Sequence, residues 1–174
     1  MRALYVFAAL SVAALTMVPG VNAQEQKNVE GDKLPDVAYP DLEGESLALS
    51  SLKGHPVILD VWATWCPPCR EAMPKLQAFH EKHGEGEKGL KVIGLSVDKQ
   101  SDPVKAYLEE NDITFTILWA PGNQDDLNKL AKAIGLRGIP RTLFIDDEGV
   151  VRADLLGLHS DEDYAKALKS IGVE

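Results

Sequence analysis

Residues 57–70 read VILDVWATWCPPCR and predict a strand, a turn and the start of a helix. The apolar run 57–62 is typical of a strand covered on both faces, and a helical pattern begins at Pro67, where a missing N–H costs little. The turn carries Cys66 and Cys69, the two cysteines of the chain. A helix N-terminus favours the reactive thiolate. We therefore expect Cys66, at the exposed edge of the turn, to attack a disulfide, and the more covered Cys69 to release the mixed disulfide.

Three other uses of such a cysteine pair are less favoured. A structural bridge across two residues would close a very short loop and stabilise little. A zinc site needs about four ligands, and the four histidines of the chain do not cluster with the cysteines in sequence. Covalent haem attachment needs a histidine directly after the second cysteine, where Arg70 stands. The pattern therefore favours a redox-active dithiol, with no metal and no cofactor beyond the Cys66–Cys69 disulfide.

The N-terminus predicts export. Arg2 precedes an apolar run at 3–18, and small residues precede a cut after Ala23, as in a secretory signal peptide over residues 1–23. The alternative is an uncleaved anchor, but a run of 16 residues is short for a membrane span of about 20. The sequence therefore favours cleavage and a periplasmic location.

The composition predicts one acidic, soluble domain. Removal of the signal peptide would take away one basic residue and no acidic one, so the net charge of −9 would become −10. That charge argues against nucleic-acid or anionic-membrane binding. Residues 24–33 are polar and predict a flexible leader, and 34–174 are long enough for one compact domain, which we expect to be a monomer.

The rest of the chain alternates strands with helices. Its pattern predicts a hairpin at 38–49, strands at 90–97, 114–119, 142–145 and 150–156, and helices at 67–83, 102–108, 125–134 and 161–171. This order indicates an α/β sheet that is mostly parallel, with antiparallel strands added at the end.

Asp60 interrupts the apolar strand before the dithiol. A carboxylate in a buried strand is costly unless it is paired or protonated. It is either a hydrogen-bonded structural residue or an acid–base group with a raised pKa behind the start of the helix. The pattern does not choose between the two.

At this point the sequence resembles the TlpA/ResA-like branch of the thioredoxin-fold thiol–disulfide oxidoreductases, over most of residues 34–172. The motif at 65–69 (WCPPC), the proline in the following helix at Pro74, and the segment 138–140 (GIP) carry the resemblance. Asp60 falls where thioredoxin carries its buried aspartate. The resemblance implies a thioredoxin fold: a mixed central sheet flanked by helices, with an N-terminal β-hairpin and a central αβ insertion.

The resemblance implies the roles of Ile139 and Pro140, and the residues themselves predict the other roles around the dithiol. Pro140 would be cis and lie against the cysteines, and the backbone of Ile139 would pair with an extended substrate. Trp65 would shield the dithiol and contact substrate, and Pro67 and Pro68 would stiffen the active-site turn. Arg70 and Arg141 either set the local charge or are solvated.

One departure concerns proton transfer. Members of this branch often carry a glutamate three residues after the second cysteine, where this chain has Ala72. Glu71 is adjacent but points about 100° away around a helix. Asp60 could take over the proton handling.

The leading functional hypothesis is a reductase of disulfides in exported proteins, such as apocytochrome c or copper-site proteins, re-reduced by a membrane thiol donor. The same motif also serves a disulfide-donating oxidase, because direction depends on reduction potential. A thiol-based copper(I) carrier is a weaker alternative. The chain lacks the threonine that a peroxiredoxin places three residues before its cysteine, since Ala63 stands there.

Overall fold

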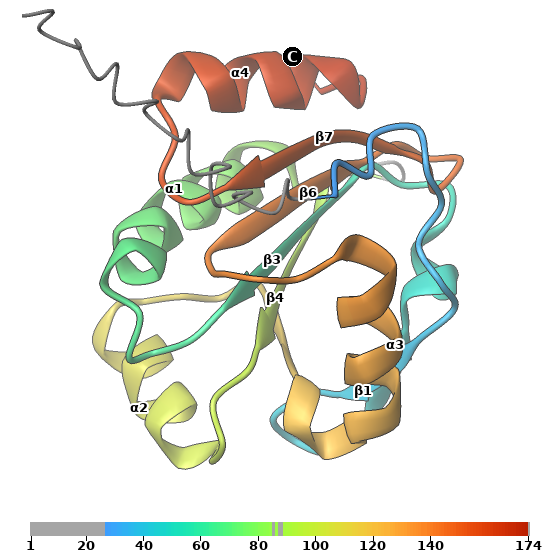
Figure 1. Ribbon diagram of the computed structural model, residues 1–174. Coiled ribbons are helices and arrows are strands. Elements are labelled where there is room, and N and C mark those ends of the chain that lie inside the picture. Colours follow the sequence, from blue (N-terminus) through green and yellow to red (C-terminus); the bar gives the residue numbers. More distant parts are fainter. Residues whose placement is uncertain (1–26, 85, 87–88, 174) are drawn as a thin grey trace, which may run out of the picture.

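Figure 1 shows the computed structural model, which describes residues 27–84, 86 and 89–173. The predicted signal peptide lies outside these ranges. In chain order the elements are β1 (Ala38–Pro40), β2 (Ser46–Ala48), the 3-10 helix η1 (Leu49–Leu52), β3 (Val57–Trp62), α1 (Pro67–His83), β4 (Lys91–Ser96), α2 (Asp102–Glu110), β5 (Thr116–Trp119), the 3-10 helix η2 (Ala120–Asn123), α3 (Gln124–Ile134), β6 (Arg141–Ile145), β7 (Val151–Leu156) and α4 (Asp161–Ser170). Within the described part of the chain, no helix is long and apolar enough to cross a membrane.

A mixed sheet of five strands, in the order β5-β4-β3-β6-β7, forms the centre of the molecule. β3 pairs in parallel with β4 and antiparallel with β6. All six residues of β3 are buried, as its apolar run predicts. Because successive side chains of a strand point to opposite faces, Ile58 and Trp62 join one core cluster, while Leu59 and Val61 join the other.

Helices cover both faces of the sheet. Buried side chains of α1, α2 and α4 belong to the cluster that contains Trp62, and those of α3 belong to the cluster that contains Leu59. In Figure 1, α1 and α2 accordingly lie on the other side of the sheet from α3. The hairpin β1–β2 and the pair α2–β5, inserted between β4 and α3, agree with the fold expected from the sequence.

The N-terminal segment differs from the expected flexible leader. The described part of that leader, residues 27–33, lies along β7, where Gly31 N–H donates to Val151 O at 2.7 Å and Val151 N–H donates to Asp32 O at 2.9 Å. Val29 is buried, with 1% of its surface exposed. β7 is an edge strand, whose unpaired backbone groups need partners, and this segment supplies them. The folded domain therefore begins before residue 34.

Candidate active site

The dithiol lies where β3 passes into α1. Cys66 is the N-cap residue of α1 and is bonded to Cys69, with a Cα–Cα distance of 5.3 Å. The Cys69 N–H donates to Cys66 Sγ at 3.2 Å. Pro67 and Pro68 occupy the first two helical positions, and proline has no N–H. The helix therefore directs one N–H, that of Cys69, to the sulfur of Cys66.

Cys66 is less exposed than the sequence suggested. Its exposed fraction is 4% and that of Cys69 is 0%. Cys69 is therefore the more buried of the two, as predicted, but Cys66 does not lie at an exposed edge of the turn. The carbonyl of Ile139 lies against it, with O 3.8 Å from Cys66 Sγ. Trp65, in contrast, is 66% exposed. The indole of Trp65 is therefore accessible beside a dithiol that is itself almost fully covered.

The loop beside the dithiol has the predicted conformation. The Ile139–Pro140 peptide bond is cis. Pro140 O accepts a hydrogen bond of 2.8 Å from Gly157 N–H, at the end of β7. Ile139 is half-buried and packs against both core clusters. The structure therefore brings this loop, which is 73 residues away in the chain, to Cys66.

Arg141, directly after the cis-proline, is not the solvated residue that the sequence allowed. It is fully buried and donates to both carboxylate oxygens of Asp154, with Nε 2.8 Å from Oδ1. Its guanidinium also donates to Lys27 O at 2.8 Å and to Gly135 O at 3.3 Å. A guanidinium can satisfy several acceptors at once, and this one joins β6 to β7, to the end of α3 and to the N-terminal segment.

Asp60 is fully buried on β3, opposite Thr142 of β6. Thr142 Oγ1 donates to Asp60 Oδ1 at 2.7 Å, and Oδ2 has no hydrogen-bond partner among the described residues. Burial raises the pKa of Asp60 to about 7, although the bond from Thr142 lowers it. Because side chains alternate along β3, Asp60 faces the same side of the sheet as Trp62, whose core cluster includes both cysteines. Its carboxyl can therefore take up or release a proton near neutral pH.

The position of the missing glutamate is packed into the core. Ala72 is buried and Glu71 is exposed, as the helical geometry predicted. In the described parts of the chain, no group of three His, Cys, Asp or Glu side chains is placed to hold a metal ion.

Asp98, which is not among the residues predicted from the sequence, contacts the active-site turn. It is buried, with 4% of its surface exposed, and accepts hydrogen bonds from Thr64, two residues before Cys66. A signal existed, because Asp98 follows the strand β4, which is parallel to β3 and ends at the same edge of the sheet. Beside this contact lies an open hollow of about 490 Å³, lined by Thr64, Trp65, Val97, Asp98, Lys99, Gln100 and Pro103.

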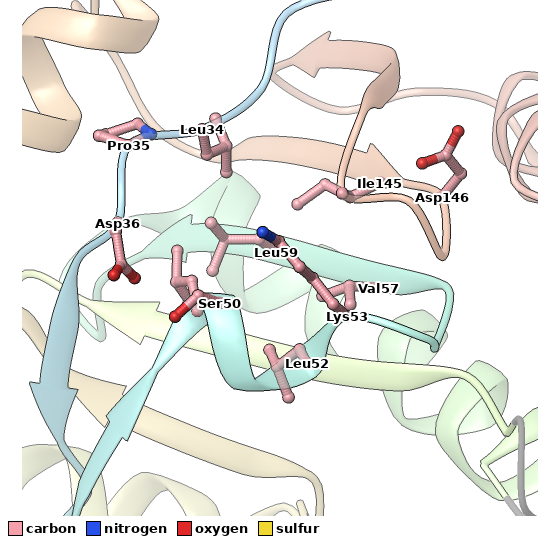
Figure 2. A pocket seen from close by; sticks show the side chains of 12 residues that line it. Leu34, Pro35, Asp36, Ser50, Leu52, Lys53, Val57, Leu59, Ile145 and Asp146 are labelled. Carbon is pink, nitrogen blue, oxygen red and sulfur yellow. The ribbon is translucent and has the colours of Figure 1, made fainter.

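A second hollow lies at the other end of β3 (Figure 2). Its lining includes the apolar Val57, Leu59 and Ile145 and the charged Lys53 and Asp146. Val57 begins β3, whereas Cys66 follows the end of that strand. This hollow is therefore separate from the dithiol.

Comparisons with known proteins agree with this site. The model of the AhpC/TSA family matches residues 30–154. The chain is 30% identical to the thiol-disulfide oxidoreductase ResA of Bacillus cereus over 156 residues, which cover 90% of this chain and 86% of the relative. A crystal structure of a putative thiol:disulfide interchange protein DsbE from Chlorobium tepidum aligns with a TM-score of 0.70 and 29% identity, covering 82% of this chain and 98% of that one. The thioredoxin domain of a thiol-disulfide oxidoreductase from Bacteroides vulgatus aligns with a TM-score of 0.72 and 25% identity, covering 84% and 100%.

Proposed function

The chain belongs to the AhpC/TSA family, in its ResA/TlpA-like branch of thioredoxin-fold thiol–disulfide oxidoreductases, and on this premise we propose that it is an exported reductase of protein disulfides. The proposed substrates are disulfides in other exported proteins, such as apocytochrome c or copper-site proteins. The proposed electron donor is a membrane thiol protein. The proposed location is the periplasm, after cleavage behind Ala23, and the predicted signal peptide supports it.

The observation that carries the direction is the small number of donors at Cys66. A helix N-cap side chain commonly accepts from the N–H of the second or third helical residue. Here the second residue is Pro68, and within the part of the chain that the structure describes Cys69 alone supplies an N–H to the sulfur. Hydrogen bonds to a charged group favour that charged form, so few donors leave the thiolate of Cys66 weakly stabilised. A dithiol whose reduced form is weakly stabilised is a reductant.

The chemistry runs in two exchanges. The thiolate of Cys66 attacks one sulfur of the substrate disulfide, which forms a mixed disulfide and releases the other substrate sulfur as a thiolate. Asp60 then accepts the proton of the Cys69 thiol, and the resulting thiolate attacks Cys66 Sγ. The substrate leaves with both sulfurs reduced, and the protein keeps the Cys66–Cys69 disulfide until the donor returns two electrons. No further cofactor is needed.

The surroundings of Cys66 support a polypeptide substrate. The proposed contacts are the exposed indole of Trp65 and the backbone of Ile139, whose carbonyl already lies against the sulfur. Pro140 would hold that backbone in place, and Pro67 and Pro68 would fix the turn. We propose that the protein acts as a monomer.

The deciding experiment is the reduction potential of the Cys66–Cys69 pair, measured by equilibrating the mature domain with defined glutathione buffers. A value well below about −200 mV supports the reductase. A value near about −120 mV would make the protein a disulfide donor, and the proposed direction would be wrong.

A second experiment tests the role of Asp60. Stopped-flow kinetics of Asp60→Asn should show normal formation and slow resolution of the mixed disulfide, because the Cys69 proton loses its acceptor. The reduced variant with Cys69 replaced by Ser serves as the matched control that forms the mixed disulfide and cannot resolve it. Wild-type resolution rates in Asp60→Asn would remove Asp60 from the mechanism.

A further inference from the structure

Three parallel strands deliver polar groups to the edge of the sheet where the dithiol lies. β5, β4 and β3 are neighbours and run in parallel, so their carboxyl ends meet at one edge. Trp119 ends β5, Asp98 follows β4, and Thr64 follows β3. Their side chains form a connected hydrogen-bond network at that edge.

The carboxylate of Asp98 binds Thr64 at two points. Thr64 N–H donates to Oδ2 at 2.9 Å, and Thr64 Oγ1–H donates to Oδ1 at 2.6 Å. Ser96 Oγ–H also donates to Oδ2 at 2.9 Å, and Trp119 Nε1–H donates to the backbone carbonyl of Asp98 at 2.8 Å. Asp98 is thereby fixed from β4 and β5 and presents both of its oxygens to the active-site turn.

Burying the carboxylate of Asp98 would be energetically unfavourable if it served the stability of the fold alone. Asp98 is nearly fully buried. Its carboxylate accepts hydrogen bonds from Thr64 and Ser96, and none of the salt bridges among the described residues includes it. Burying a charge is expensive even when its hydrogen bonds are made. What this arrangement provides is a fixed active-site turn, because the two hydrogen bonds to Thr64 hold the backbone immediately before Trp65 and Cys66.

We propose that Asp98 is a positioning residue for the disulfide exchange, which holds Trp65 and Cys66 in the orientation that a docked protein substrate requires. It acts through Thr64 and does not itself touch the reacting sulfurs. The inference rests on disulfide exchange at Cys66 and holds for either direction of electron flow.

The substitutions separate this contact from the rest of the network. Asp98→Ala removes both bonds to Thr64. Asp98→Asn keeps them, because its amide oxygen can accept from Thr64 N–H while its amide nitrogen donates to Thr64 Oγ1. Thr64→Val removes the hydroxyl bond alone. Ser96→Ala is the matched control, since it removes a buried bond to the same carboxylate without touching the turn.

The experiment compares a bulky substrate with a small one. Reduction of insulin measures exchange with a docked protein disulfide, and alkylation of the reduced protein by iodoacetamide measures the reactivity of Cys66 alone. We expect Asp98→Ala to lower the insulin rate about tenfold and Thr64→Val roughly threefold, since hydrogen bonds to a charged group are lost. We expect alkylation to change less than about twofold, and Asp98→Asn and Ser96→Ala to keep most of the wild-type insulin rate.

The double variant of Asp98→Ala with Thr64→Val should be no slower than Asp98→Ala alone, because both changes remove the same contact. Should Asp98→Ala fail to fold, Thr64→Val and its control decide the question. An insulin rate within twofold of wild type in folded Asp98→Ala and Thr64→Val, or a parallel fall of insulin reduction and alkylation in them, would overturn the positioning role. A wild-type protein that does not reduce insulin but oxidises a reduced protein would overturn the proposed direction alone. The same variants compared in that oxidation then decide the positioning role, so the two failures are distinguishable.

Discussion

Replacing Asp60 with asparagine should change the pH dependence of stability by a calculable amount. The pKa of Asp60 is raised from its ordinary 3.8 to about 7, chiefly by burial. Between about pH 4 and pH 7 the native state therefore holds a proton that the unfolded state has released. Stability falls as pH rises through this window, by about 1.4 kcal/mol per pH unit. Across the whole window the wild type loses about 4 kcal/mol of its free energy of unfolding, and above the native pKa of Asp60 that loss is complete.

The asparagine variant has no such titration. Its amide takes the place of the neutral acid, and Thr142 can still donate to Oδ1. The other atom of the group, Oδ2 in the acid and the amide nitrogen in the variant, has no hydrogen-bond partner among the described residues. We therefore expect Asp60→Asn to match the wild type within about 1 kcal/mol near pH 4 and to exceed it by about 2–4 kcal/mol above pH 8. Other titrating groups cancel in the difference between the two proteins.

The assay is urea unfolding of both proteins in their oxidised form, from pH 4 to pH 8.5. Parallel stability curves would refute the raised pKa of Asp60, and with it the physical basis for its role as proton acceptor. Thr142→Val sharpens the test, because the lost bond lowers the pKa of Asp60 in the wild type. In that variant the free energy of unfolding should continue to fall further above pH 7. If the pH midpoint of that fall stays where it is in the wild type, the bond from Thr142 has no influence on the pKa of Asp60.

Further predictions concern single contacts. Asp154→Ala should lower the free energy of unfolding by about 3–5 kcal/mol in urea titrations, because Arg141 would remain buried without its partner. A loss below about 1 kcal/mol would contradict the burial of the Arg141 charge. Pro68→Ala restores an N–H at the second helical position, so the midpoint of the pH profile for alkylation of Cys66 should move to lower pH. An unchanged midpoint would mean that the number of N–H donors at Cys66 does not decide the direction of electron flow. Ser160→Ala should cost about 1 kcal/mol in urea unfolding, because it breaks the capping box of α4, and a neutral effect would show that solvent replaces this cap.

The sequence by itself determined the features whose partners are neighbours in the chain. The apolar run before the dithiol, the prolines after Cys66 and the helix that follows are local patterns, and the structure has all three. Local spacing also predicted that Cys69 is the more covered cysteine and that Glu71 points away from the direction of Ala72. The cis bond at Pro140 came from the resemblance rather than from spacing, and the structure has it as well.

Only the tertiary structure decided which distant residues complete the site. Thr142 lies 82 residues from the carboxyl of Asp60 that it contacts, Asp98 lies 34 residues from Thr64, and the partner of Arg141 lies on the next strand. A polar residue that is solvated and one that is buried against a partner look the same in a single sequence, because burial and pairing depend on strand order and register. The same limit applies to residues 27–33, whose polar composition predicted a free leader, while the unpaired edge of β7 provides the backbone partners that hold them.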